Sequence, residues 1–194
     1  GWSSLKDFQA LESLSYRAPA GEINWKVLAT LPNLRVVSLE SIADGALEGV
    51  HQCQQIRSLH LSQSITDAGL RSVTDMPNLE SLTLWHSRID GSGFADVKNL
   101  TRLKSVRLDG TQLNDEGLKY VAQLPALEKI SFEGAKVTPE GMKALLQAKQ
   151  TLKHVTPTDL VYSGRETNNA YYRVAQEIRE SAPGVEFDFR VDAP

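Results

Sequence analysis

One apolar pattern, leucine-x-x-leucine-x-x-leucine-x-leucine, recurs about every 23 residues along this chain. Related apolar residues replace leucine at some positions, but the spacing is kept. The six copies are Phe8-Leu11-Leu14-Tyr16, Leu31-Leu34-Val37-Leu39, Cys53-Ile56-Leu59-Leu61, Met76-Leu79-Leu82-Leu84, Leu100-Leu103-Val106-Leu108 and Leu124-Leu127-Ile130-Phe132. A chain with such a period winds into successive coils that share one local structure, which constrains its fold more than its length does.

The end of each copy has the pattern of a strand. Val106 and Leu108, for example, lie on either side of the polar Arg107. This alternation is typical of a strand with one buried face. We therefore expect every copy to add one short strand to a parallel sheet.

A helix start follows the strand in several copies. Thr66, Asn114 and Thr138 are suitable caps for the free amide groups of a first turn, and Pro139 fits the first helical position. The acidic residues nearby complement the positive end of the helix dipole. Pairs of apolar residues three positions apart then predict one buried helical face: Leu47/Val50, Leu70/Val73, Phe94/Val97, Leu118/Val121 and Met142/Leu145.

These features predict an α/β fold, a leucine-rich repeat solenoid of horseshoe shape, with the parallel sheet on the concave side and helices on the convex side. We expect residues 1–155 to hold the repeats behind a partial helical cap of Trp2, Leu5 and Phe8. We expect residues 156–194 to form a carboxyl-terminal cap with a loop, a helix and a strand at 185–191. Four glycines recur in register and predict close packing between copies: Gly69, Gly93, Gly117 and Gly141.

The motif from Ile56 to Leu61, followed by Thr66-Asp67-Ala68-Gly69-Leu70, resembles the cysteine-containing, ribonuclease-inhibitor-like class of leucine-rich repeats. It is most similar to the bacterial relatives of the repeats in F-box proteins. The resemblance spans about residues 8–155 and implies a recognition scaffold. The asparagine or cysteine ladder of this class is largely replaced here by Ile42, Ser64, Ser87, Thr111 and Ala135, and no F-box-like segment is visible before the repeats. We therefore expect no role in ubiquitin ligation.

Composition argues against several partner classes. A formal net charge of −3 gives no reason to expect nucleic acid or an anionic membrane surface. No apolar run approaches the ~20 residues that span a bilayer, so we expect no membrane insertion in this segment. No signal-like start is visible, and we expect an excised domain, so its localisation stays open. The single cysteine cannot form an internal disulfide.

The residues between the buried strand positions should face outward on the concave sheet in three parallel columns. The first column is Ser13, Val36, Ser58, Ser81, Ser105 and Lys129; the second is Ser15, Ser38, His60, Thr83, Arg107 and Ser131; the third is Arg17, Glu40, Ser62, Trp85, Asp109 and Glu133. Adjacent strands lie ~4.8 Å apart, so neighbours in a column can contact one ligand together.

Trp85 is the most informative outward residue, because an exposed tryptophan gains nothing from folding unless something covers it. We expect it to anchor a partner, with Thr83, His60 and Glu40 nearby and a polar rim of Arg107, Asp109 and Glu133. The alternatives are that the indole lies across Arg107 or Ser62 on its own sheet, and that the rim is a solvated surface with local ion pairs.

The residues that suggest catalysis have simpler explanations. His60 and His86 occupy non-equivalent slots, and no His-x-x-x-His spacing exists, so we predict surface histidines and no metal site. Cys53 takes a slot that is apolar in other copies, which favours a buried role over a nucleophile. The glycine-rich 91–93 lacks the Lys-Ser/Thr pair of a phosphate loop and predicts a tight turn. We predict no catalytic residue and no cofactor.

The sequence therefore predicts a non-enzymatic scaffold that binds an unidentified protein or peptide on its concave sheet. A structural or spacer domain of a larger surface protein is an alternative. A further alternative is an ectodomain that binds saccharides, for which an aromatic side chain on a serine-rich sheet is suitable.

Overall fold

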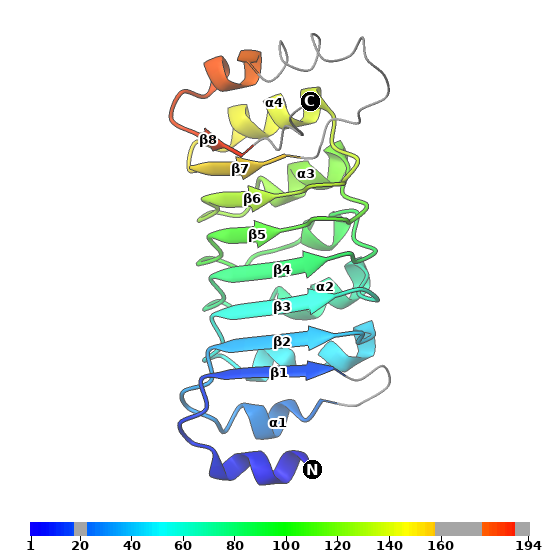
Figure 1. The fold of residues 1–194 in the computed structure, drawn as a ribbon, viewed down its shortest axis with the longest axis vertical. Helices are drawn as coiled ribbons and strands as arrows, with labels where there is room; N and C mark the ends of the chain where they lie inside the picture. Colours follow the sequence, from blue (N-terminus) through cyan, green and yellow to red (C-terminus); the bar gives the residue numbers. More distant parts are fainter. Residues whose placement is uncertain (18–22, 158–175, 189–194) are drawn as a thin grey trace, which may run out of the picture.

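A single parallel sheet forms the spine of the molecule (Figure 1). The computed structural model describes residues 1–17, 23–157 and 176–188. The strands are hydrogen-bonded in chain order, as a continuous winding requires. They are β1 (Ser13–Arg17), β2 (Val36–Glu40), β3 (Ser58–Ser62), β4 (Ser81–Trp85), β5 (Ser105–Arg107), β6 (Lys129–Ser131), β7 (His154–Thr156) and β8 (Glu186–Phe187).

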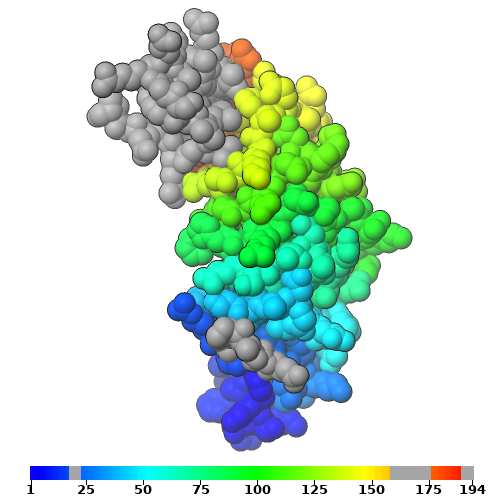
Figure 2. All heavy atoms as spheres, turned by 90° about the vertical axis from the view of Figure 1, so that its right-hand side faces the viewer, coloured from blue at the N-terminus to red at the C-terminus, as the bar shows by residue number. Residues whose placement is uncertain are grey.

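The return segments carry short helices, which Figure 1 shows behind the sheet, and within the described ranges no helix covers the other sheet face. The α-helices are α1 (Trp25–Leu28), α2 (Asp67–Val73), α3 (Asp115–Val121) and α4 (Pro139–Ala148). The 3-10 helices are η1 (Trp2–Asp7), η2 (Asp44–Leu47), η3 (Val50–Gln52) and η4 (Ser92–Phe94). This is the predicted α/β leucine-rich repeat solenoid. Figure 2 looks onto the carboxyl ends of the strands and shows the coils stacked in sequence order.

The predicted helix caps are confirmed, but two predicted helices are wrong. Thr138 Oγ1 accepts a hydrogen bond from the Gly141 amide at 3.2 Å, as a capping residue should. Gly49, with φ +92°, separates Leu47 and Val50 into two 3-10 turns, because a left-handed residue ends a helix. The coil at Phe94 likewise forms only a 3-10 turn.

The apolar repeat forms one continuous core. Every skeleton residue of the second to sixth copies is buried. The first copy is different: Phe8, which directly follows η1, is 58% exposed. Trp2 and Leu5 do pack against the core, and the Trp2 ring lies 4.8 Å from that of Tyr16.

Recurrent glycines let the coils approach one another closely, as the sequence predicts. A Cβ on Gly117 would lie 1.8 Å from the carbonyl oxygen of Asp90, and one on Gly93 would lie 2.8 Å from that of Asp67. No side chain fits at these distances, so alanine at either position would force the coils apart.

Aspartates at the helix starts join each coil to the next. The Asp44 carboxylate accepts hydrogen bonds from the amide and hydroxyl of Thr66, at 2.8 and 2.5 Å. Asp115 repeats this pair with Thr138, at 2.8 and 2.6 Å. Asp67 accepts from three backbone N–H groups of the following coil, at 2.8 to 3.2 Å. These carboxylates therefore join consecutive coils, in addition to their favourable interaction with the helix dipole.

The carboxyl-terminal residues that the structure describes continue the sheet. β8 pairs in parallel with β7, and Ile178 is fully buried in the helical segment 176–181. The predicted loop after residue 157, the start of the helix and the strand beyond residue 188 lie outside the described residues. The division of the chain at residue 155 stays a prediction. The helices within the described ranges are all too short or too polar to span a membrane.

Candidate binding face

Strand register brings the predicted outward residues into columns. The second column pairs in unbroken order across six strands: Ser15, Ser38, His60, Thr83, Arg107 and Ser131. The third column is paired as far as Trp85, and beyond it the His86 amide donates to the Asp109 carbonyl at 2.9 Å. We call the sheet surface that carries these columns the open face.

A hollow of about 510 Å³ lies on the open face over β2, β3 and β4. We call it the Trp85 hollow. Trp85 is 50% exposed, so its indole is available to a ligand. The residues that line the hollow are Ser38, Leu39, Glu40, His60, Leu61, Ser62, Gln63, Thr83, Trp85 and His86.

The Trp85 indole is held beside the ring of the following residue. The ring centroids of Trp85 and His86 lie 4.7 Å apart, with an angle of 37° between their planes. His86 adopts φ +50°, which turns its side chain back toward the open face. The next coil has Gly110 at this slot, and a Cβ there would meet His86 Nδ1 at 2.2 Å. The imidazole thus lies over Gly110 and supports Trp85.

Left-handed backbone recurs immediately after the third column. Ser41, Gln63 and His86 have φ values of 58°, 74° and 50°, whereas the next two coils have Gly110 and Gly134 at this slot. A residue other than glycine costs roughly 1–2 kcal/mol in this conformation. Strained backbone of this kind is commonest at functional sites. Two of the three residues, Gln63 and His86, line the Trp85 hollow.

His60 contributes a polar edge to the hollow. Its Nε2 lies 3.0 Å from the hydroxyl oxygen of Ser58. Burial lowers the pKa of His60 below its ordinary value, because the charged imidazolium loses solvation. Burial therefore favours the neutral imidazole, which can donate or accept one hydrogen bond.

Asp109 differs from its predicted place in an exposed rim. It is only 4% exposed, because its carboxylate accepts hydrogen bonds from the Ser131 hydroxyl at 2.5 Å and the Glu133 amide at 2.9 Å. The Arg107 Nε also donates to it. The side chain of Arg107 remains about half exposed. The buried aspartate thus fixes an exposed guanidinium on the open face.

Glu40 lies at the opposite wall of the hollow from Trp85. Its carboxylate forms an ion pair with Arg17 Nε at 3.5 Å, and the side chains are 52% and 72% exposed. Ion pairs this exposed are worth about 0–1 kcal/mol. The Glu40 carboxylate therefore remains open to a competing ligand.

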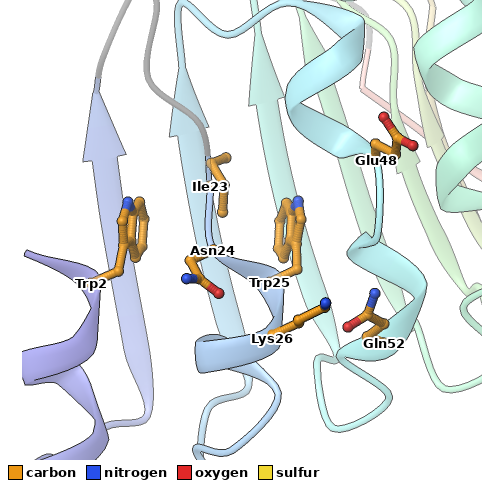
Figure 3. A pocket seen from close by; sticks show the side chains of 7 residues that line it. All are labelled: Trp2, Ile23, Asn24, Trp25, Lys26, Glu48 and Gln52. Carbon is orange, nitrogen blue, oxygen red and sulfur yellow. The ribbon is translucent and has the colours of Figure 1, made fainter.

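A second hollow, of about 300 Å³, lies at the amino-terminal end away from these columns (Figure 3). Trp25 forms one wall but is buried, and its indole N–H donates to the Ala46 carbonyl at 2.7 Å. The repeat pattern does not predict this core residue, although the cap residue Asn24 before the apolar Trp25 and Leu28 is a signal of a helix start.

Cys53 has the buried position that its slot predicts. Its side chain is fully buried, and burial raises the pKa of the thiol to about 12. Its Sγ lies 3.4 Å from the carbonyl oxygen of Trp25. A thiol with this pKa is not a nucleophile at neutral pH. Within the described ranges, no three histidine, cysteine or acidic side chains converge as metal ligands would.

Comparison with known proteins finds similarity among solved structures. No protein-family model and no curated protein matches the chain. One of the solved structures that it resembles is an internalin from Listeria monocytogenes, with 19% sequence identity and a TM-score of 0.48. The match covers 82% of this chain and 50% of the internalin chain, so this chain spans about half the length of that protein.

Proposed function

We propose that this solenoid is a non-enzymatic scaffold that binds a protein or peptide partner on its open face, around Trp85, His60 and Arg107. The observation that carries the proposal is the half-exposed Trp85 indole beside a hollow of about 510 Å³. Apolar pockets with a few converging polar groups are the usual form of a binding site.

The energetics of Trp85 support the proposal. Covering half of an aromatic side chain that offers roughly 200 Å² removes about 100 Å² from water, worth about 2.5 kcal/mol. Folding leaves this half of the indole in water, so its burial can stabilise only a complex with a partner. Contacts with His86 restrict the indole before binding, so less conformational entropy is lost on association.

The surrounding residues supply specificity. Arg107 presents a guanidinium that Asp109 holds in place, and arginine is enriched among residues that dominate binding energy. Thr83, Glu40 and Glu133 complete a polar rim in which charges steer the encounter and select the partner. Asp109 acts in this proposal through Arg107, since it is itself buried.

We also infer that the repeats belong to the cysteine-containing, ribonuclease-inhibitor-like class, whose bacterial F-box-like relatives they resemble. The position at which this class often has asparagine or cysteine supports the inference, although in several copies it holds serine or threonine here. The hydroxyls of Ser87 and Thr111 are buried and donate to the carbonyls of Leu84 and Leu108, at 3.1 and 2.7 Å. Hydroxyl groups thus satisfy backbone carbonyls at the slot where that class often has asparagine or cysteine.

Affinity capture from a lysate of the source organism tests the proposed function. Wild type should retain a protein that Trp85→Ala loses. Lys119→Ala is the matched control, because Lys119 lies on α3 with an exposed side chain on the helical side. Equal recovery by all three proteins would refute the site. A glycan array that binds wild type but not Trp85→Ala, without any captured protein, would favour a saccharide ligand instead.

A further inference from the structure

We propose that the Trp85 hollow receives a basic side chain, preferably arginine, from the partner. This inference rests on the proposed function and names the chemistry that the hollow selects. Three features carry it: the width of the hollow along the third column, the charge of its lining, and the aromatic wall.

The width follows from strand register. Glu40, Ser62 and Trp85 are direct neighbours on β2, β3 and β4. Two strand spacings separate Glu40 from Trp85, which places their backbones about 9.6 Å apart. The small Ser62 between them leaves a gap that admits one flat or narrow side chain. Such a group would have a carboxylate on one side and an indole on the other.

The charge of the lining favours a cation. The described residues that line the hollow include the carboxylate of Glu40 and neither lysine nor arginine. Burial lowers the pKa of His60 and so favours its neutral form, which adds no opposing charge. Arg17 already pairs with Glu40 from β1, so a guanidinium is compatible with this carboxylate.

The aromatic wall distinguishes arginine from other basic groups. A cation over an indole gains about 0.5–2 kcal/mol, and the planar guanidinium also stacks on the ring. It is more weakly hydrated than the lysine ammonium, so it loses less solvation on entering the hollow. Gln63 adds a carboxamide oxygen, which accepts a hydrogen bond from the Ser41 hydroxyl at 2.8 Å. That carboxamide is held over the hollow by a left-handed backbone.

Titration with small probes tests the charge requirement. Nα-acetyl-arginine amide should shift the Trp85 indole N–H resonance in NMR spectra, with the resonance assigned by Trp85→Phe. Nα-acetyl-citrulline amide has the same shape without the charge and should bind about tenfold more weakly. Glu40→Gln should weaken arginine binding by a similar factor, whereas Glu116→Gln, on the exposed helical side, should not. Equal binding of both probes, or saturation by chitotriose alone, would overturn the inference.

A displayed library of random peptides separates this inference from the proposed function. Peptides that bind wild type and lose binding to Trp85→Ala should share an arginine or lysine, and replacement of that residue should abolish binding. Trp85-dependent peptides without a basic residue would overturn the inference and leave the proposed function standing. If no peptide depends on Trp85 and the arginine probe gives no shift, both are wrong.

Discussion

The imidazole of His86 occupies the space that a side chain on Gly110 would need. A Cβ on Gly110 would lie 2.2 Å from His86 Nδ1. Gly134, one coil later, has nearly the same backbone, with φ +68° against +65°, but the nearest atom to its Cβ position is 3.7 Å away. Alanine at either glycine would strain the backbone, but only alanine at Gly110 would also displace His86, which supports Trp85.

Gly110→Ala should weaken partner binding, whereas Gly134→Ala should not. Both substitutions place alanine in left-handed backbone, at a cost of about 1–2 kcal/mol in the free energy of unfolding. Gly110→Ala also displaces the exposed His86 ring, so that Trp85 loses its support. Urea denaturation and binding titration measure the two effects. Equal affinity of the two variants would contradict this account.

Asp67→Ala should destabilise the solenoid by about 2 kcal/mol, because three backbone N–H groups of the next coil would lose their acceptor. Glu116→Ala is the control, since its exposed ion pair with Lys119 is worth about 0–1 kcal/mol. Urea denaturation of both variants provides the comparison. Equal losses would show that the carboxylate of Asp67 does not join the coils.

Stability should fall as the pH decreases below about 6.5, in part through His60. Burial lowers the folded-state pKa of His60 from 6.5, so the unfolded state binds more protons between the two pKa values. The contribution is complete above the unfolded pKa and is lost as the pH falls toward the folded one. His60→Gln should flatten this dependence, and replacement of the exposed His51 should not. NMR titration of the His60 ring should give a pKa below 6.5.

Cys53 should resist thiol reagents in the folded protein. Its thiol is buried with a pKa of about 12, so almost no thiolate exists at pH 8. Reaction with 5,5′-dithiobis(2-nitrobenzoate) should appear only in denaturant. Cys53→Ser should cost about 1–3 kcal/mol because it buries a hydroxyl in an apolar slot, and Cys53→Val should be better tolerated. Rapid labelling of the native protein would refute this buried role.

Sequence periodicity predicted the open face in detail, because strand alternation leaves only one orientation for each residue. The predicted neighbours Ser62 and Trp85 are paired in the sheet. The predicted exposure failed at Asp109, which is only 4% exposed, because alternation gives the face of a side chain and not the groups that cover it. The Asp109 carboxylate lies beside the outward residues Arg107 and Ser131 and accepts hydrogen bonds from both of them and from the Glu133 amide.

Contacts between coils were harder to predict. The sequence suggested a surface role for His86, and its contact with Gly110 depends on how two coils stack. The sequence did contain a signal of this contact, because His86 and Gly110 each directly follow a third-column residue in neighbouring copies. The carboxylate of Asp115 was explained by the helix dipole, whereas it also bonds Thr138 of the next coil. Such hydrogen bonds depend on the distance between two coils, and the sequence of a single repeat gives no information on that distance.

Site-specific photo-crosslinking of the partner complex tests the central claim most directly. A p-benzoylphenylalanine in place of Ser105, on the open face of the strand next to β4, should crosslink the partner, and Trp85→Ala in the same protein should abolish the product. The same group in place of Arg71, exposed on α2, should give no crosslink. A crosslink from Arg71 and none from Ser105 would place the partner on the helical side and contradict binding on the open face.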